Sequence, residues 1–85
     1  MFDTAGLGER FTRSQIGLLK LVAESGALKA SYRQIAIITG FGRRRVQRDM
    51  QRLLMRGALR ADRPGGNFYR LGSEFARWEA GHRSS

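Results

Sequence analysis

The sequence predicts a mainly α-helical fold with a small β-hairpin. Two capping-box motifs, Thr12–Gln15 and Ser31–Gln34, each precede a segment whose apolar residues recur at helical spacing. The turn sequence Arg63–Asn67 contains proline, two glycines and asparagine, and it separates two short candidate strands. With 85 residues and no cysteine, the chain has room for one thin core and forms no disulfide framework.

The N-terminal half of the chain is expected to contain two helices. Residues 1–10 show little periodicity and are expected to form an N-terminal arm. The first helix is expected from about residue 12 to residue 25, because Gly26 supplies a stop. A second, short helix opens at Ser31 and ends at Gly40.

A third helix is expected from Arg43 to Arg56. Val46, Met50 and Leu53 lie on one face of this segment, and Gly57 ends it. Two short strands are then expected, with a turn between them, which completes a domain that spans residues 11–72. The expected strands are residues 59–62 and residues 68–71.

The last residues are expected to form a short helix, residues 73–81, and a frayed tail, residues 82–85. Phe75 and Trp78 lie three apart on one face of that helix. We favour the interpretation that both fold back onto the first helix and complete the core. The alternative is a homodimer contact, which Leu18 and Leu21 of the first helix would extend.

Positive charge is concentrated in the middle of the chain. The net charge is +9, and residues 31–70 carry ten arginines against two acidic residues. A charge that served only solubility would be spread along the chain, whereas a local excess of arginine is typical of a surface that binds nucleic acid. Three of these arginines, Arg43, Arg44 and Arg45, occupy the first turn of the third helix, where the helix dipole disfavours cations. An adjacent phosphate backbone would reverse that effect.

The order helix, helix, tight turn, helix, hairpin resembles the winged helix-turn-helix domain over residues 12–71. Ala36, Gly40 and Val46 match the spacing of the small residue, turn glycine and apolar anchor of that family. The run from Gly42 to Leu53 is most similar to gluconate-operon-repressor-type bacterial regulators. Asp49 departs from the family pattern, and an ion pair with Arg45 or Arg52 would accommodate it.

The resemblance implies that the third helix enters the major groove of DNA while the hairpin lies on the backbone or in the minor groove. Arginine can bind guanine and glutamine can bind adenine. We expect base contacts from Arg43, Arg44 and Gln47, with Gln51 also facing outward. Phosphate contacts are expected at the following positions: Arg45, Arg48 and Arg52 on the third helix, Arg63 in the hairpin turn, and Tyr32 and Arg33 at the start of the second helix.

No pattern in the sequence points to an enzyme. The single histidine, His82, lies in the expected tail, the carboxylates are scattered, and no phosphate-binding glycine loop or metal-ligand spacing is present. We therefore expect no catalytic residue, no metal, no cofactor and no small-molecule effector. No segment approaches the length of a membrane span, so no membrane partner is expected either.

The expected function is sequence-specific binding of double-stranded DNA by a cytoplasmic, nucleoid-associated protein. It would act as a small bacterial-type transcriptional regulator or a replication-associated factor, with a possible homodimer. Two alternatives stay open. One is a winged-helix module that binds RNA or another protein, and the other is a nucleoid-type protein that binds DNA without sequence preference.

Overall fold

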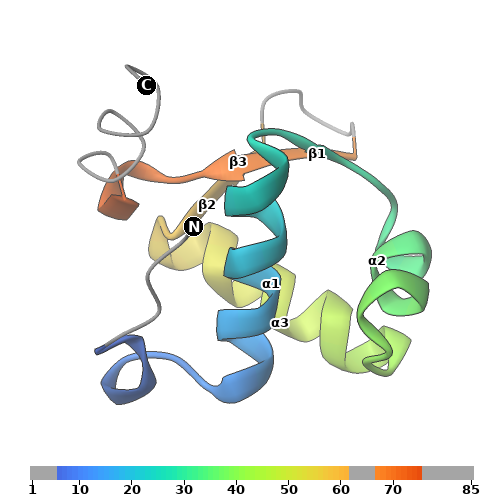
Figure 1. Ribbon diagram of the computed structural model, residues 1–85, viewed down its shortest axis with the longest axis horizontal. Helices are drawn as coiled ribbons and strands as arrows, with labels where there is room; N and C mark the ends of the chain where they lie inside the picture. Colours follow the sequence, from blue (N-terminus) through green and yellow to red (C-terminus); the bar gives the residue numbers. More distant parts are fainter. Residues whose placement is uncertain (1–5, 62–66, 76–85) are drawn as a thin grey trace.

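The structure, a computed structural model, describes residues 6–61 and 67–75, in which three helices pack against a small antiparallel sheet (Figure 1). The sheet lies along the top of the view and α3 crosses below it, with α1 in front and α2 to the right. The elements are α1 (Arg13–Ser25), β1 (Leu28–Lys29), α2 (Tyr32–Thr39), α3 (Arg43–Arg56), β2 (Leu59–Ala61) and β3 (Phe68–Leu71). The prediction of a mainly helical fold with a small β component is confirmed.

Both capping boxes form as the sequence predicts. The Thr12 hydroxyl accepts a hydrogen bond from the Gln15 N–H, and the Gln15 side chain accepts one from the Thr12 N–H at 3.0 Å. Ser31 and Gln34 make the same pair of bonds at the start of α2. These bonds satisfy N–H groups that a helix leaves unpaired, which is why α1 and α2 begin where they do.

The sheet has three strands in the order β1-β3-β2, so the expected hairpin is only part of it. Its central strand, β3, pairs with β1 through Leu28 opposite Tyr69 and with β2 through Leu59 opposite Leu71. The strand β1 was not predicted, because two residues are too few to show the alternation that identifies a strand. The turn that joins β2 to β3 falls within residues 62–66, which lie outside the described residues.

The core lies between the helices and the sheet. It is formed by apolar side chains that come from every described helix and strand. The most deeply buried large side chains are Leu18, Leu19, Val22, Ile35, Val46, Met50, Leu53 and Leu59. The apolar stripe predicted for α3 is therefore confirmed as its inward face.

Gly72 approaches Gly57 closely where the end of α3 meets the end of β3. A Cβ atom at residue 72 would lie 1.9 Å from the carbonyl oxygen of Gly57. The Gly72 N–H also donates a hydrogen bond of 2.8 Å to the carbonyl oxygen of Ala58. Backbone thus packs directly on backbone, and only glycine fits at residue 72.

The described part of the N-terminal segment packs against the domain. Leu7–Glu9 form a 3₁₀ helix, and Leu7 is buried in the core. Phe11 is also buried, and its ring centroid lies 6.2 Å from that of Phe75. Phe75 is thus part of the core and contacts Phe11, which precedes α1, whereas Trp78 lies outside the described residues.

The residues proposed to extend a dimer contact are mostly buried. Leu18 is 1% exposed and Leu21 is half-buried, because both pack toward the core of the same chain. The predicted contact at Leu18 is therefore wrong. Of the helix expected over 73–81, the described part is a 3₁₀ helix, Ser73–Phe75, and the remainder, like the tail 82–85, lies outside the described residues.

An ion-pair network joins the two ends of the described chain. Arg10 donates a hydrogen bond of 2.8 Å to the carboxylate of Glu74, and Arg56 lies 3.5 Å from the same oxygen. Arg56 also donates to the carbonyl oxygen of Arg10 at 2.9 Å and stacks 4.1 Å from the ring centroid of Phe11. The end of α3 is thereby tied to both terminal segments.

Among the helices described, none has the length and apolar character to cross a bilayer.

Candidate nucleic-acid interface

The helix α3 begins with three arginines and without a side-chain cap. Its N-cap is Gly42, whose backbone is extended and which offers no oxygen to the first N–H groups. Arg43, Arg44 and Arg45 follow, and all are exposed. Cations at the positive end of a helix dipole cost about 0.3–1 kcal/mol each when exposed. An anion bound at the start of α3 would stabilise this arrangement, because it would interact favourably with both the helix dipole and the three arginines.

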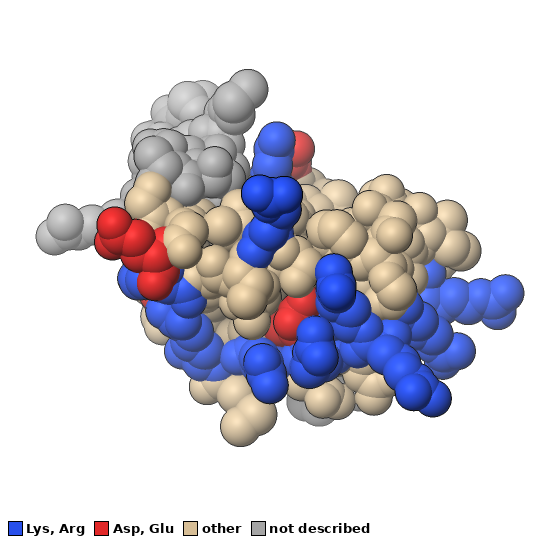
Figure 2. Space-filling model, turned by 90° about the horizontal axis from the view of Figure 1, so that it is seen from below, with Lys and Arg blue, Asp and Glu red and all other residues tan. Residues whose placement is uncertain are grey.

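The outward face of α3 is mostly basic and polar, although the apolar side chain of Met55 on the same helix is 89% exposed. Figure 2 shows the molecule from below Figure 1, and the basic side chains form a band across this face. Asp49, the one acidic residue of α3, is only 2% exposed. All seven predicted residues of α3 are exposed: Arg43, Arg44, Arg45, Gln47, Arg48, Gln51 and Arg52.

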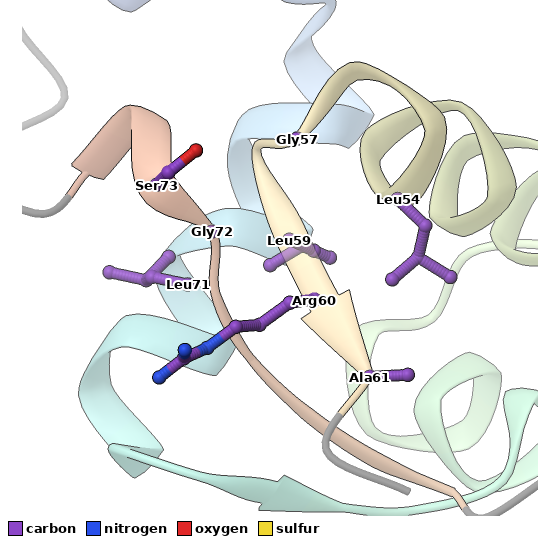
Figure 3. Close-up of a pocket in the computed structure, with 8 residues that line it drawn as sticks. All are labelled: Leu54, Gly57, Leu59, Arg60, Ala61, Leu71, Gly72 and Ser73. Carbon is purple, nitrogen blue, oxygen red and sulfur yellow. The ribbon is translucent and has the colours of Figure 1, made fainter. Parts of the chain in front are cut away.

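This exposed face has two flanks that differ in their neighbours. On one side of α3, Leu54 packs near β2, as Figure 3 shows, and helical spacing places Gln47 and Gln51 toward that side. On the other side, Arg45 and Arg52 face the start of α1. The glutamines and the flanking arginines predicted from the sequence are thus presented on different edges of one surface.

A recess lies between the start of α1 and α3, and we call it the α1–α3 recess. It has a volume of about 290 Å³ and is lined by Thr12, Arg13, Ser14, Arg45, Arg48, Asp49 and Arg52. Arg13 was not among the predicted site residues, because it lies on a different helix and nothing local in its sequence links it to α3. The recess brings together four guanidinium groups and one carboxylate.

Asp49 forms the inner wall of the recess, and its partners differ from those predicted. Its Oδ2 accepts a hydrogen bond of 2.7 Å from the Ser14 hydroxyl, and its Oδ1 lies 3.9 Å from Nε of Arg48. The predicted ion pair with Arg45 or Arg52 is therefore wrong. The reason is that Asp49, with a side chain 3% exposed, points toward the first turn of α1, where Ser14 binds one carboxylate oxygen, while the other oxygen pairs with Arg48.

Tyr32 and Arg33 lie at the start of α2, as predicted, but they differ in exposure. Arg33 is exposed, whereas Tyr32 is half-buried and stacks on Tyr69 of β3, with ring centroids 6.2 Å apart and planes 16° apart. Burial, followed by a hydrogen bond with Tyr32, raises the pKa of Tyr69 to about 12. Tyr32 therefore packs α2 against the sheet through its contact with Tyr69.

The strands carry further arginines, but the predicted wing residue lies outside the described residues. That residue is Arg63. Arg60 is exposed on β2, and Arg70 on β3 is half-buried with its guanidinium 6.0 Å from the ring centroid of Phe68. Figure 3 shows that the Arg60 side chain extends away from α3, across β3, so these strand arginines are not part of the α3 face.

A second hollow, of about 560 Å³, lies between the end of α3 and the strands β2 and β3 (Figure 3). Its lining is mostly backbone and aliphatic, and its polar side chains are Arg60 and Ser73. The described residues that line it include no carboxylate and no histidine. In residues 6–61 and 67–75, no three side chains of the metal-ligating types come together. His82 lies outside these residues.

The α3 face and the α1–α3 recess are therefore the parts of the described surface where the predicted arginine and glutamine side chains gather. Their exposed arginine and glutamine side chains can bind phosphate groups and the edges of bases. Comparison of the chain with known protein families, with curated proteins and with solved structures gives no match.

Proposed function

We propose that the chain is a winged helix-turn-helix domain that binds double-stranded DNA at specific sequences. The order of its elements supports this proposal, because α2, a tight turn and α3 are followed by a hairpin whose second strand pairs with β1. The turn between α2 and α3 is formed at Gly40. Its φ of 78° lies in the left-handed region, which glycine adopts more readily than other residues. This is the arrangement in which a recognition helix projects from its support.

One observation supports the proposal most strongly: α3 exposes two glutamines and six arginines, of which Arg56 pairs with Glu74, while its one carboxylate is buried. Charge attraction alone would need only the arginines. Glutamine adds the donor and acceptor pair that can recognise adenine, and arginine adds the fork that recognises guanine. A surface that combines both residue types supports recognition of base sequence in addition to backbone binding.

In the proposed complex, the N-terminal half of α3 lies in the major groove. Arg43, Arg44 and Gln47 contact base edges, while the arginines on the recess side contact phosphates. The hairpin lies against the adjacent backbone or minor groove. The biological role that follows is occupation of a defined site, as in a bacterial-type transcriptional regulator or a replication-associated factor of the cytoplasm and nucleoid.

Selection of bound sequences from a pool of random duplexes tests this proposal. We expect the wild-type chain to enrich a motif, and we expect Arg44→Ala and Gln47→Ala to lose preference at particular positions, at about 1–3 kcal/mol per lost base contact. A palindromic motif, together with sedimentation of the free and bound protein, would identify a homodimer.

The same binding assay distinguishes the alternatives. Tighter binding to duplex RNA or to an acidic polypeptide than to duplex DNA would favour a module for RNA or protein. Equal affinity for all duplexes, with a steep salt dependence, would favour a nucleoid-type protein. Absence of binding to any duplex at low salt would overturn the proposal.

A further inference from the structure

We infer that the α1–α3 recess binds one phosphodiester group of the DNA strand that runs beside α3. This inference rests on the proposed function. It extends the interface beyond α3 to the first turn of α1, and it gives Arg13 a role that no sequence pattern indicated. The recess would then fix the position of the duplex along α3.

The first step of the argument is the charge of the recess. Four arginines line it, Arg13 on α1 and Arg45, Arg48 and Arg52 on α3, together with the acidic residue Asp49. The formal excess is three positive charges. Like charges gathered around one space repel each other, so an anion in that space is favoured.

The second step is the state of these side chains. Within the described part of the chain, the side chains of Arg13, Arg45 and Arg52 form no ion pair, hydrogen bond or ring contact. Asp49 pairs with none of these three, because one of its oxygens accepts a hydrogen bond from Ser14 at 2.7 Å and the other pairs with Arg48. Three guanidinium groups therefore keep their N–H donors for a ligand.

The third step is the shape and the lining. A volume of about 290 Å³ holds a phosphate group together with several water molecules, each of which takes about 30 Å³ in the liquid. No aromatic or aliphatic side chain lines the recess, so a nucleobase would find nothing to stack on. The chemistry thus selects a phosphate rather than a base.

The fourth step is position. Arg45, Arg48 and Arg52 stand three to four residues apart, so they form a row along the edge of α3 that faces α1. A strand that follows this row would place one phosphate between α3 and Arg13. Two helices would then contact the same group, which fixes both the distance and the angle of approach of the duplex.

The test compares Arg13→Ala with Lys20→Ala. Lys20 is an exposed cation on the same helix that does not line the recess, so its removal changes the net charge equally. On a random-sequence duplex, we expect Arg13→Ala to weaken binding by about 3–10-fold. The plot of log association constant against log salt concentration should also become less steep, with the magnitude of its slope smaller by about 1. Lys20→Ala should change affinity less than 2-fold, by roughly the effect of an exposed charge outside the contact.

Arg52→Ala provides a second variant from the opposite wall of the recess, and it should lower the salt slope in the same way. If Arg13→Ala and Lys20→Ala bind alike while the wild type binds DNA, the inference is wrong and the proposed function stands. If the wild type binds no duplex, both the inference about the recess and the proposed function are wrong.

Nuclear magnetic resonance distinguishes a DNA phosphodiester from a free anion. The amide signals of residues 12–14 should shift when the duplex is added, and these shifts should be lost in Arg13→Ala. Inorganic phosphate alone should reproduce them only at millimolar concentration. Saturation by micromolar inorganic phosphate would assign the recess to a free anion and overturn the inference.

Discussion

The Ser14 hydroxyl donates a hydrogen bond of 2.7 Å to Oδ2 of Asp49, and it thereby joins the first turn of α1 to the middle of α3. These two residues lie 35 positions apart in the sequence. The bond lies beneath a group of arginines, so it holds a carboxylate inside the fold while the surface above it stays positive. The same bond sets the relative position of the two helices that form the α1–α3 recess.

Replacement of Ser14 by alanine should destabilise the fold. A buried carboxylate would lose a hydrogen bond without gaining water, which costs about 1–3 kcal/mol. Urea unfolding measures the change. Ser25→Ala is the matched control, because the Ser25 hydroxyl bonds to the carbonyl oxygen of Leu21 at the exposed end of the same helix. Equal losses of unfolding free energy in the two variants would show that the buried hydrogen bond stabilises the fold no more than the exposed one does.

Arg56 and Arg52 should separate stability from binding. Arg56→Ala removes a hydrogen bond to the Arg10 carbonyl oxygen and a stacking contact with Phe11, which together stabilise the fold by about 1–2 kcal/mol. Its exposed ion pair with Glu74 adds little. Arg52→Ala should leave the unfolding free energy unchanged and weaken DNA binding. A thermal melt and a binding titration on each variant test this contrast, and the reverse pattern would contradict it.

Gly72→Ala should disrupt the junction between α3 and β3. The added methyl group would overlap the carbonyl of Gly57, so the backbone would have to move and the hydrogen bond to Ala58 would be lost. We expect a loss of several kcal/mol, which is on the order of the whole stability of a small domain. Gly8→Ala is the control, because no heavy atom of the described chain lies within 4 Å of its added methyl group. Circular dichroism during heating compares the two, and similar melting temperatures would refute this prediction.

Stability should fall at high pH because of Tyr69. Burial, followed by its hydrogen bond with Tyr32, raises its pKa from the ordinary value of about 10 to about 12. The unfolded chain therefore loses this proton first as the pH rises. The contribution of Tyr69 to stability is complete below pH 10 and is lost between about pH 10 and pH 12.

Urea midpoints at pH 9 and pH 11.5 for the wild type and Tyr69→Phe measure this effect. The wild type should lose more stability than the variant, since phenylalanine cannot ionise. Parallel losses in both proteins would assign the alkaline transition to other groups.

The helices could be predicted from sequence because their signals are local. A capping box at Thr12, another at Ser31, and glycines at residues 40 and 57 mark their ends within a few residues of chain. The outward set on α3 could be predicted for the same reason, since Val46, Met50 and Leu53 define the opposite face by spacing alone.

The strand β1 and the α1–α3 recess could not be predicted because they depend on distant residues. Leu28 and Lys29 are a strand only because Tyr69 and Phe68 lie opposite them. Arg13 meets Arg45 only after α1 and α3 have packed together. The partner of Asp49 could not be predicted for the same reason, because Ser14 belongs to the other helix. Charge attraction within α3 predicted a neighbour on the same helix, and tertiary packing placed Asp49 elsewhere.

The position of β3 in the sheet has a consequence for the order in which the domain assembles. Among the described strands it is the last in the sequence and the middle one in space, so β1 and β2 both lack a partner in this sheet until β3 is synthesised. During synthesis, α3 with its arginines leaves the ribosome before the sheet that supports it can close. The pairing of Leu28 with Tyr69 must then close a long loop, which makes this step slow relative to helix formation. A nascent chain of this domain therefore presents its positive helix, still without its sheet, beside the nucleic acid of the ribosome that makes it.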